Sequence, residues 1–336
     1  MPSIYKKIDY YFLPKAMVLM YHRIATVDYD PWQLCVTPSN FEQQLQFYNT
    51  HFDIISVAEL VEQLLKKQVQ KNTVCITFDD GYADNYLEAK PLLEKYNCPA
   101  TFFIASNYIN SNKLFWWDQL EDIILASPVL PQTILFSIKG EEFKFSVANT
   151  VLADSDIDKQ KQWQWPNEAP NERCKLYLEI WEILLPHDYN EIASVIQQLC
   201  AQTNYQTVAP EGKIPMSANQ LKLMSSNGLF DLGIHTNTHP ALPFHSKEYQ
   251  LGEMLACRNF LQPTYQQQLN TIAYPYGKYN EATLHAVKEA GIEAAFTTNE
   301  KMVTKKSDLL SLGRFQVNNW NANQLSQQMK YWKKMI

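Results

Sequence analysis

The sequence predicts an α/β fold in which a mostly parallel sheet or barrel carries a large inserted segment. Short apolar runs alternate with stretches of helical periodicity over residues 16–105, and the alternation returns from residue 217 onward. Such alternation is typical of parallel strands joined by helices. The rhythm stops over residues 107–214, which predicts an insertion. Polar clusters follow several of the apolar runs, and the carboxyl ends of parallel strands commonly form the functional face.

The first half of the alternation is expected to hold four strands separated by three helices. The apolar runs that predict strands lie at residues 16–22, 52–57, 73–78 and 98–105. Apolar residues at helical spacing predict helices at residues 38–50, 57–67 and 86–96. Ser39 is the expected N-cap of the first helix, because its hydroxyl can accept a backbone N–H.

The second half repeats the pattern, and the segment between the halves does not. Helices are expected at residues 217–226, 247–261, 280–290 and from 322, and strands at 229–234, 271–274, 294–298 and 310–317. Within the insertion we expect helical stretches up to residue 126 and over 172–202, a polar stretch at 154–171, and a β-hairpin of residues 133–137 and 142–147. Residues 1–106 and 215–336 are therefore assigned to one (β/α) unit, and residues 107–214 to an insertion of helices plus a β-hairpin.

Composition excludes some classes of partner. The 336 residues have a formal net charge of −6 and no basic stripe, which argues against a nucleic-acid partner. Six cysteines are scattered without a C-x-x-C pair, as expected for free thiols in a reducing compartment. Residues 1–20 lack the apolar core of a signal peptide, and no run there could span a bilayer. We therefore expect a cytoplasmic protein without a transmembrane segment; peripheral membrane contact and the oligomeric state stay open.

Two adjacent carboxylates mark the end of the apolar run at residues 73–78. Asp79 and Asp80 follow that run directly, and Gly81 comes next. Adjacent buried carboxylates repel one another, so their pKa values tend to separate. A metal ion on one of them removes the conflict and leaves the other free to act as a base. The alternative is an ordinary surface turn between a strand and a helix, because Asp and Gly are also common in turns.

Two histidines follow the strand expected at residues 229–234. His235 and His239 are four residues apart, so a helical turn would place both imidazoles on one side, and Pro240 would end that turn. With Asp80 they form a three-ligand set suited to Zn²⁺, and three protein ligands leave a position open for water. The alternative is a pair of loop histidines bonded to the backbone.

Three motifs resemble those of the polysaccharide deacetylases, the NodB-like domain of carbohydrate esterase family 4. Residues 77–82 (TFDDGY) match the first motif, residues 235–239 (HTNTH) the second, and residues 273–277 (AYPYG) are similar to the third. The resemblance covers roughly residues 16–106 and 215–318. It implies a distorted (β/α) barrel that removes acetyl groups from N-acetylated sugars with the help of a metal.

The resemblance also implies roles for individual residues. Asp79 would be the general base, and the metal ligands would be Asp80, His235 and His239. The third motif, which contains Pro275, would place the backbone N–H of Tyr276 at the developing oxyanion. The implied cofactor is one divalent ion, with Zn²⁺ expected first and Co²⁺, Ni²⁺ or Mn²⁺ as alternatives.

The sequence departs from the family pattern at two places. The third motif commonly starts with an Arg that pairs with the catalytic Asp, and here Ala273 stands there. Arg314 could supply the guanidinium from the last strand, or it could be an ordinary surface residue. The family's fifth-motif histidine, which protonates the leaving amine, is not evident. His22 is the preferred substitute, as acid or as substrate ligand; His245 is a weaker one, and a structural imidazole is the alternative for His22.

Aromatic residues could line a sugar cleft, since their faces stack on pyranose rings. The candidates are Trp116, Trp117 and Trp320, and the alternative is that they anchor the insertion to the barrel.

The expected function is metal-dependent hydrolysis of the N-acetyl group of an acetamido sugar in a polysaccharide, oligosaccharide or glycan precursor. A cytoplasmic location favours a biosynthetic intermediate over finished cell wall. One alternative is a related hydrolase acting on a non-sugar C–N bond. The other is a carbohydrate-binding protein on a catalytically decayed scaffold, which the missing histidine and Ala273 would favour.

Overall fold

A curled sheet forms the centre of the protein, and the computed structural model describes residues 14–203, 205 and 211–335. Six strands follow the order β11-β10-β9-β6-β5-β1 and pair in parallel. They are β1 (Lys15–Tyr21), β5 (Thr73–Phe78), β6 (Ala100–Ile104), β9 (Phe230–Ile234), β10 (Thr271–Ala273) and β11 (Ala294–Phe296). Three short strands extend the sheet: β4 (Asp53–Ile54) pairs with β5, β13 (Phe315–Gln316) pairs with β1, and β12 (Val303–Thr304) runs antiparallel to β1.

The two sides of this sheet are joined by the segment that precedes β13. Phe296 in β11 forms a parallel bridge with Leu312. The N–H of Leu312 donates to the carbonyl of Ala295 at 2.9 Å, and the N–H of Ala295 donates to the carbonyl of Leu309 at 2.7 Å. The same segment continues into β13, which lies beside β1. The sheet is therefore a distorted (β/α) barrel, which confirms the expected fold class.

Side chains of the central strands alternate between the inside of the barrel and the surrounding helices. In β1, Val18 belongs to an interior apolar cluster, whereas Leu19 packs in the cluster beneath the outer helices. In β5, Cys75 lies in the interior cluster and Ile76 in the outer one. The same alternation places Asp79, four residues after Cys75, on the interior side at the carboxyl end of β5.

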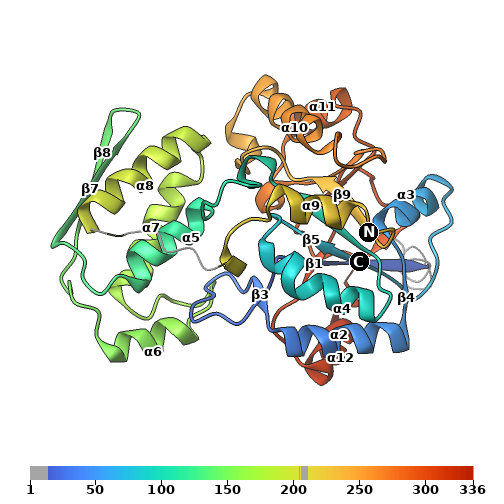
Figure 1. The fold of residues 1–336 in the computed structure, drawn as a ribbon, viewed down its shortest axis with the longest axis horizontal. Helices are drawn as coiled ribbons and strands as arrows, with labels where there is room; N and C mark the ends of the chain where they lie inside the picture. Colours follow the sequence, from blue (N-terminus) through green and yellow to red (C-terminus); the bar gives the residue numbers. More distant parts are fainter. Residues whose placement is uncertain (1–13, 204, 206–210, 336) are drawn as a thin grey trace, which may run out of the picture.

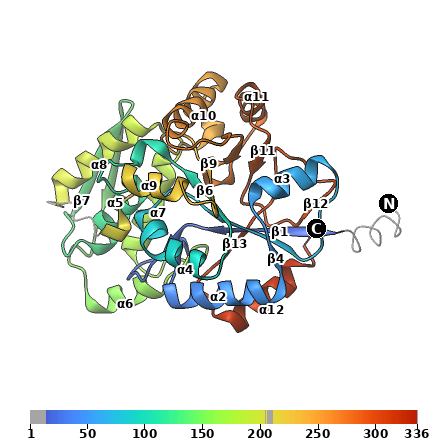
Figure 2. The same ribbon diagram turned by 45° about the vertical axis from the view of Figure 1, so that its right-hand side comes forward.

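Helices cover the outside of the barrel on both sides (Figures 1 and 2). They are α2 (Pro38–His51), α3 (Val57–Leu65), α4 (Lys90–Lys95), α9 (Ala218–Ser225), α10 (Lys247–Leu261), α11 (Glu281–Glu289) and α12 (Ala322–Trp332). In both views α2 lies beside α12, and α10 beside α11 on the opposite side. The expected N-cap Ser39 is wrong: Thr37 caps α2 by accepting the N–H of Asn40, because Pro38 takes the first helical position.

The insertion forms a separate layer beside the barrel (Figure 1). Its elements are α5 (Trp116–Glu121), the hairpin of β7 (Thr133–Ile138) and β8 (Glu141–Ser146), α6 (Asp154–Gln162), α7 (Glu172–Leu184) and α8 (Tyr189–Thr203). Their apolar side chains share a second core, which also takes in Tyr82 from the barrel. Residues 154–171 were expected to be a polar stretch; they contain α6, whose apolar content is too low to predict a helix. The helical stretch at 172–202 is divided near Pro186.

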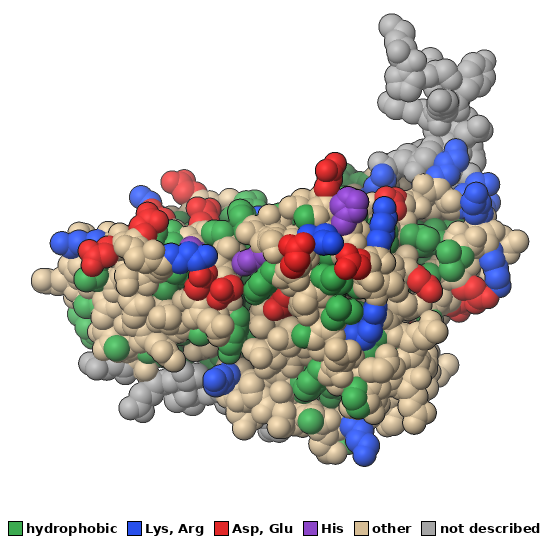
Figure 3. Space-filling model, turned by 90° about the horizontal axis from the view of Figure 1, so that it is seen from above, with side chains coloured by type: hydrophobic (Ala, Val, Ile, Leu, Met, Phe, Trp, Pro, Cys, Tyr) green, Lys and Arg blue, Asp and Glu red, His purple; other side chains and the backbone are tan. Residues whose placement is uncertain are grey.

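The described surface combines charges of both signs. On the face shown in Figure 3, basic and acidic side chains are interspersed rather than segregated into a stripe. No helix within the described residues is long and apolar enough to cross a membrane.

Candidate active site

A cavity of about 480 Å³ opens at the carboxyl ends of the parallel strands. Five of the six parallel strands contribute to it through the residues that follow their last apolar position, and β6 contributes none of the described lining residues. The polar lining residues from these strand ends include His22 after β1, Asp79 and Asp80 after β5, His235 and His239 after β9, Tyr274 and Tyr276 after β10, and Thr298 after β11. Strand topology therefore gathers residues from distant parts of the chain at one point, as expected for a parallel barrel.

Asp79 forms a buried ion pair with Arg314 beneath this cavity. The two guanidinium nitrogens lie 2.7 Å from the two carboxylate oxygens, a bidentate geometry. Arg314 is fully buried, and its Nε donates to the carbonyl of Thr297 at 3.1 Å. Burial alone would raise the pKa of Asp79, but the guanidinium outweighs it and holds that pKa well below its usual range. Asp79 is therefore ionised at neutral pH.

Asp80, His235 and His239 gather their ligand atoms within 4.8 Å of one another. One carboxylate oxygen of Asp80 lies 3.4 Å from the Nε2 atoms of both histidines. Within the described part of the chain, that buried oxygen has no hydrogen-bond partner. His235 Nδ1 lies 2.8 Å from the carbonyl of Ala273, which makes Nδ1 the protonated nitrogen and frees Nε2 as a ligand. An unpartnered carboxylate oxygen facing two imidazole nitrogens fits a divalent cation.

The loop between the two histidines is not the helical turn that their spacing suggested. Thr236 and His239 have positive φ angles of 65° and 60°, and the hydroxyl of Thr236 accepts the N–H of His239 at 3.1 Å. Asp80 also has a positive φ, 73°. Residues other than glycine rarely adopt this conformation, and it persists where the surrounding structure enforces it. Both imidazoles still face one point, but an irregular loop places them there.

Glu253 in α10 enforces that loop, and sequence reasoning missed it. Its buried carboxylate accepts the N–H of Asn237 at 2.9 Å, the N–H of Thr238 at 2.7 Å and the hydroxyl of Thr238 at 2.9 Å. Burial raises the pKa of Glu253, and these three donors oppose that rise. In the sequence Glu253 is one of two acids on the same helix, so no local signal distinguishes it.

His22 faces the same cavity from the end of β1. Its Nδ1 is buried, and no described residue forms a hydrogen bond with it. Its backbone carbonyl accepts the side-chain amide of Asn85 at 2.8 Å, which fixes the backbone but not the ring. Burial lowers the pKa of His22, although the two aspartates oppose the effect.

The aromatic residues singled out from the sequence have different positions. Trp117 lines the cavity, with its ring 4.7 Å from that of His239 and its Nε1 donating to the hydroxyl of Tyr82 at 2.8 Å. The ring of Tyr276 also packs against His239, with the ring centroids 4.6 Å apart, and the adjacent Pro275 is buried. Trp320 is not among the described residues that line the cavity and packs against Trp332.

His245, the weaker candidate for the acid, stacks on the ring of Tyr249 and does not line the cavity either.

Three further tryptophans form a wall of the cavity that sequence reasoning did not identify. Trp32 lies 5.6 Å from Trp165 and 4.7 Å from Trp181, measured between ring centroids. Trp165 and Trp181 belong to the insertion, whereas Trp32 follows β2 (Arg23–Ile24) in the barrel unit. They are far apart in sequence and follow no motif, so only the tertiary structure brings them together. The insertion therefore contributes directly to the candidate site.

Known proteins share this sequence pattern and fold. A family model for polysaccharide deacetylases matches residues 66–127 and 181–295. Poly-beta-1,6-N-acetyl-D-glucosamine N-deacetylase of Staphylococcus epidermidis is 27% identical over 186 residues, and this alignment spans 48% of the chain and 64% of that relative.

Two solved structures share the fold over nearly their whole length. The Streptococcus pyogenes deacetylase PplD, solved in complex with acetate, has a TM-score of 0.58 at 22% identity, covering 94% of this chain and 99% of that one. IcaB from Ammonifex degensii has a TM-score of 0.58 at 18% identity, covering 96% and 97% of the respective chains.

Proposed function

Because the chain belongs to the polysaccharide deacetylase family, we propose that it is a metal-dependent hydrolase that removes the N-acetyl group from an acetamido sugar. The substrate would be a polysaccharide, an oligosaccharide or a glycan precursor. The observation that carries this proposal is the arrangement of a charged carboxylate, Asp79, directly beside the metal-type ligand set of Asp80, His235 and His239. The name of the staphylococcal relative supports N-acetylglucosamine as the sugar.

The three ligand residues would hold one divalent ion, with Zn²⁺ as the first choice for two imidazoles and a carboxylate. When bound, such an ion lowers the pKa of a water molecule and polarises the carbonyl of the acetamide. His235 is prepared for this role because its Nδ1–H is already bonded to the carbonyl of Ala273.

Asp79 is proposed to accept the proton of the attacking water. Its bidentate pair with Arg314 keeps the carboxylate ionised and fixes its orientation, so Arg314 replaces the guanidinium that Ala273 cannot supply. The backbone N–H of Tyr276 is proposed to donate a hydrogen bond to the acetyl carbonyl oxygen as it becomes an oxyanion.

His22 is proposed to bind the substrate or to donate the proton that the leaving amine requires. It lies in the cavity with Asp79, and its buried Nδ1 has no partner within the described residues. A His22→Gln variant keeps the size and polarity of the side chain but cannot transfer a proton at neutral pH. If this variant deacetylates within a few-fold of the wild-type rate, His22 is only a substrate ligand.

The tryptophan wall is proposed to stack on sugar rings. Trp32, Trp165 and Trp181 present aromatic surface to the cavity, and about half of the Trp165 side chain is exposed. Aromatic faces bind the apolar faces of pyranoses while their edges tolerate the hydroxyl groups.

Acetate release tests the proposed function. A β-1,6-linked N-acetylglucosamine hexamer should release acetate in the presence of Zn²⁺, lose this reaction on chelation and regain it when Zn²⁺ is restored. Asp80→Asn should abolish release, whereas Asp158→Asn, at an exposed position on α6, should not. Equal release from the hexamer and from N-methylacetamide would favour a general amide hydrolase. Tight metal binding without release from any acetamido sugar would favour a decayed binding protein.

A further inference from the structure

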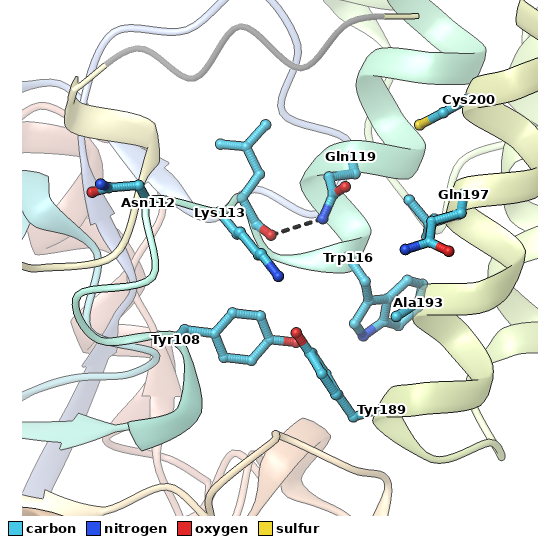
Figure 4. A pocket seen from close by; sticks show the side chains of 11 residues that line it. Tyr108, Asn112, Lys113, Trp116, Gln119, Tyr189, Ala193, Gln197 and Cys200 are labelled. Carbon is cyan, nitrogen blue, oxygen red and sulfur yellow. Dashed lines mark hydrogen bonds between the residues drawn. The ribbon is translucent and has the colours of Figure 1, made fainter.

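A second cavity lies beside the proposed active site and shares a wall with it. It has a volume of about 420 Å³ and opens between residues 108–119 and helix α8 (Figure 4). Trp116 lines this second cavity, whereas the next residue, Trp117, lines the first one. The ring of Trp116 also lies 6.1 Å from that of Trp181 in the tryptophan wall. One layer of aromatic side chains therefore separates the two cavities.

The second cavity combines aromatic faces with amide side chains. Tyr108 and Tyr189 meet edge to face, with their ring centroids 5.8 Å apart, and Trp116 lies beside them. The amides of Gln119 and Gln197 also face the cavity, as Figure 4 shows. Each amide can both donate and accept hydrogen bonds. Aromatic faces and amides together suit the apolar ring faces, hydroxyls and acetamido groups of a sugar.

The buried hydroxyl of Tyr108 indicates that this cavity binds a polar ligand. Tyr108 is 2% exposed, and its hydroxyl has no hydrogen-bond partner among the residues that the structure describes. Leaving a buried hydroxyl without a hydrogen-bond partner is unfavourable, so such groups usually have one. The amide nitrogen of Gln119 donates to the carbonyl of Leu114 at 2.9 Å, which orients this amide at the cavity. A polar ligand in the cavity would supply the partner that the Tyr108 hydroxyl lacks.

The charge of the lining selects among sugars. Lys113 is the only charged side chain among the described lining residues, and its ammonium is directed into the cavity in Figure 4. The ammonium group repels the protonated amine of a deacetylated sugar, but it does not repel a sugar whose nitrogen is acetylated and therefore neutral. The lining therefore favours N-acetylated over deacetylated units.

We propose that this second cavity binds an N-acetylated sugar unit of a glycan chain, separate from the unit that is deacetylated at the first cavity. The identity of the glycan rests on the proposed function. Binding at two places retains a long chain near the catalytic residues, because the second contact is intramolecular once the first has formed. The cavity would thus make the protein prefer long N-acetylated chains to short ones.

The test compares a hexamer and a dimer of β-1,6-linked N-acetylglucosamine as substrates. Gln197 is exposed on α8, so Gln197→Trp fills the second cavity without disturbing the core. We expect it to raise the KM for the hexamer about tenfold, the loss of about 1.4 kcal/mol of binding, with kcat and the KM for the dimer unchanged. Ser194→Trp, at an exposed position of the same helix that does not line the cavity, is the matched control.

Tyr108→Phe provides a second variant that is safe for folding. It removes the unpartnered hydroxyl, so the melting temperature should stay the same or rise, while the KM for the hexamer rises. If both variants still prefer the hexamer to the dimer as strongly as the wild type does, the proposed second binding site is refuted, even when acetate is released normally. If neither oligomer releases acetate, the proposed function fails, and calorimetry then decides the second site alone. Hexamer binding that Gln197→Trp abolishes supports the site, and binding unchanged by Gln197→Trp refutes it.

Discussion

Arg314 and Asp79 form the most consequential pair of single residues in the protein. Both are buried, and removing one partner leaves an uncompensated charge in the interior. Arg314→Ala should therefore lower the free energy of unfolding by about 3–5 kcal/mol. It should also raise the pKa of Asp79 and reduce deacetylation, even where the variant is still folded. Chemical denaturation and acetate release measure the two effects.

The double variant Asp79→Ala/Arg314→Ala is the control for this prediction. It removes both charges, so it should recover much of the stability lost by Arg314→Ala while remaining inactive. If Arg314→Ala were as stable as the wild type, the ion pair would have no role in folding. If it were fully active, Arg314 would have no role in keeping Asp79 ionised.

Glu253 is expected to increase the metal affinity without binding the metal itself. Glu253→Gln keeps the shape of the side chain but loses the charge that three donors of the ligand loop bind. Metal affinity should fall about 10–100-fold, the usual effect of residues that orient metal ligands. Titration with Zn²⁺ against a competing chelator measures this change. Glu248→Gln, on the exposed side of the same helix, should leave the affinity unchanged; equal affinities in both variants would contradict the role.

At the scale of elements, α5 connects the insertion to the segment that leads back into the barrel. Lys213 lies 3.4 Å from Glu121 and 2.6 Å from Asp122. Burial raises the pKa of Glu121 to about 8, although Lys213 opposes the rise. The folded state thus holds a proton on Glu121 at pH values where the unfolded chain, with a pKa of about 4.3, has released it.

This difference predicts how stability depends on pH. A carboxyl group whose pKa is raised in the folded state contributes stability at low pH, and this contribution is lost as the pH rises from about 4.3 to about 8. Glu121→Gln should remove that part of the decline, so its stability should fall less steeply than that of the wild type between these pH values. Urea denaturation at several pH values measures the slopes. Parallel slopes would show that Glu121 titrates normally.

Local patterns predicted the strands and their terminal carboxylates, because those signals lie within a few consecutive residues. The strand at residues 73–78 is observed at its predicted bounds, with Asp79 and Asp80 directly after it. The loop from His235 to His239 was predicted with the wrong conformation, because contacts with Glu253 enforce its positive φ angles. Its residue spacing alone also fits a helical turn.

Non-local features were predicted less well. The tryptophan wall has no sequence signal, since Trp32 and Trp181 meet only through tertiary packing. Trp320 was selected for its residue type, yet it packs against Trp332. The roles of the ligand residues, His22 and Arg314, and the cytoplasmic location stay predictions until they are measured.

At the scale of the whole molecule, the candidate site depends on both layers. The barrel supplies the carboxylates and histidines, and the insertion supplies Trp165 and Trp181. Trp165→Ala should therefore raise the KM for a glycan several-fold and leave kcat unchanged, because Trp165 touches no group proposed to transfer a proton. Steady-state kinetics with the hexamer measure this. Tyr331→Ala, at an aromatic position of similar exposure on α12, is the control. An unchanged KM in Trp165→Ala would show that Trp165 does not contribute to glycan binding.

The bridge between Phe296 and Leu312 has a consequence for how the protein is made. Arg314 follows that bridge by two residues and reaches back 235 positions in sequence to Asp79. During synthesis, Asp80, His235 and His239 emerge from the ribosome well before Arg314. A nascent or truncated chain that ends before residue 314 would thus carry every proposed metal ligand without the guanidinium that keeps the base charged. Catalytic competence would therefore require synthesis through residue 314, whereas the proposed metal ligands are complete in sequence at residue 239.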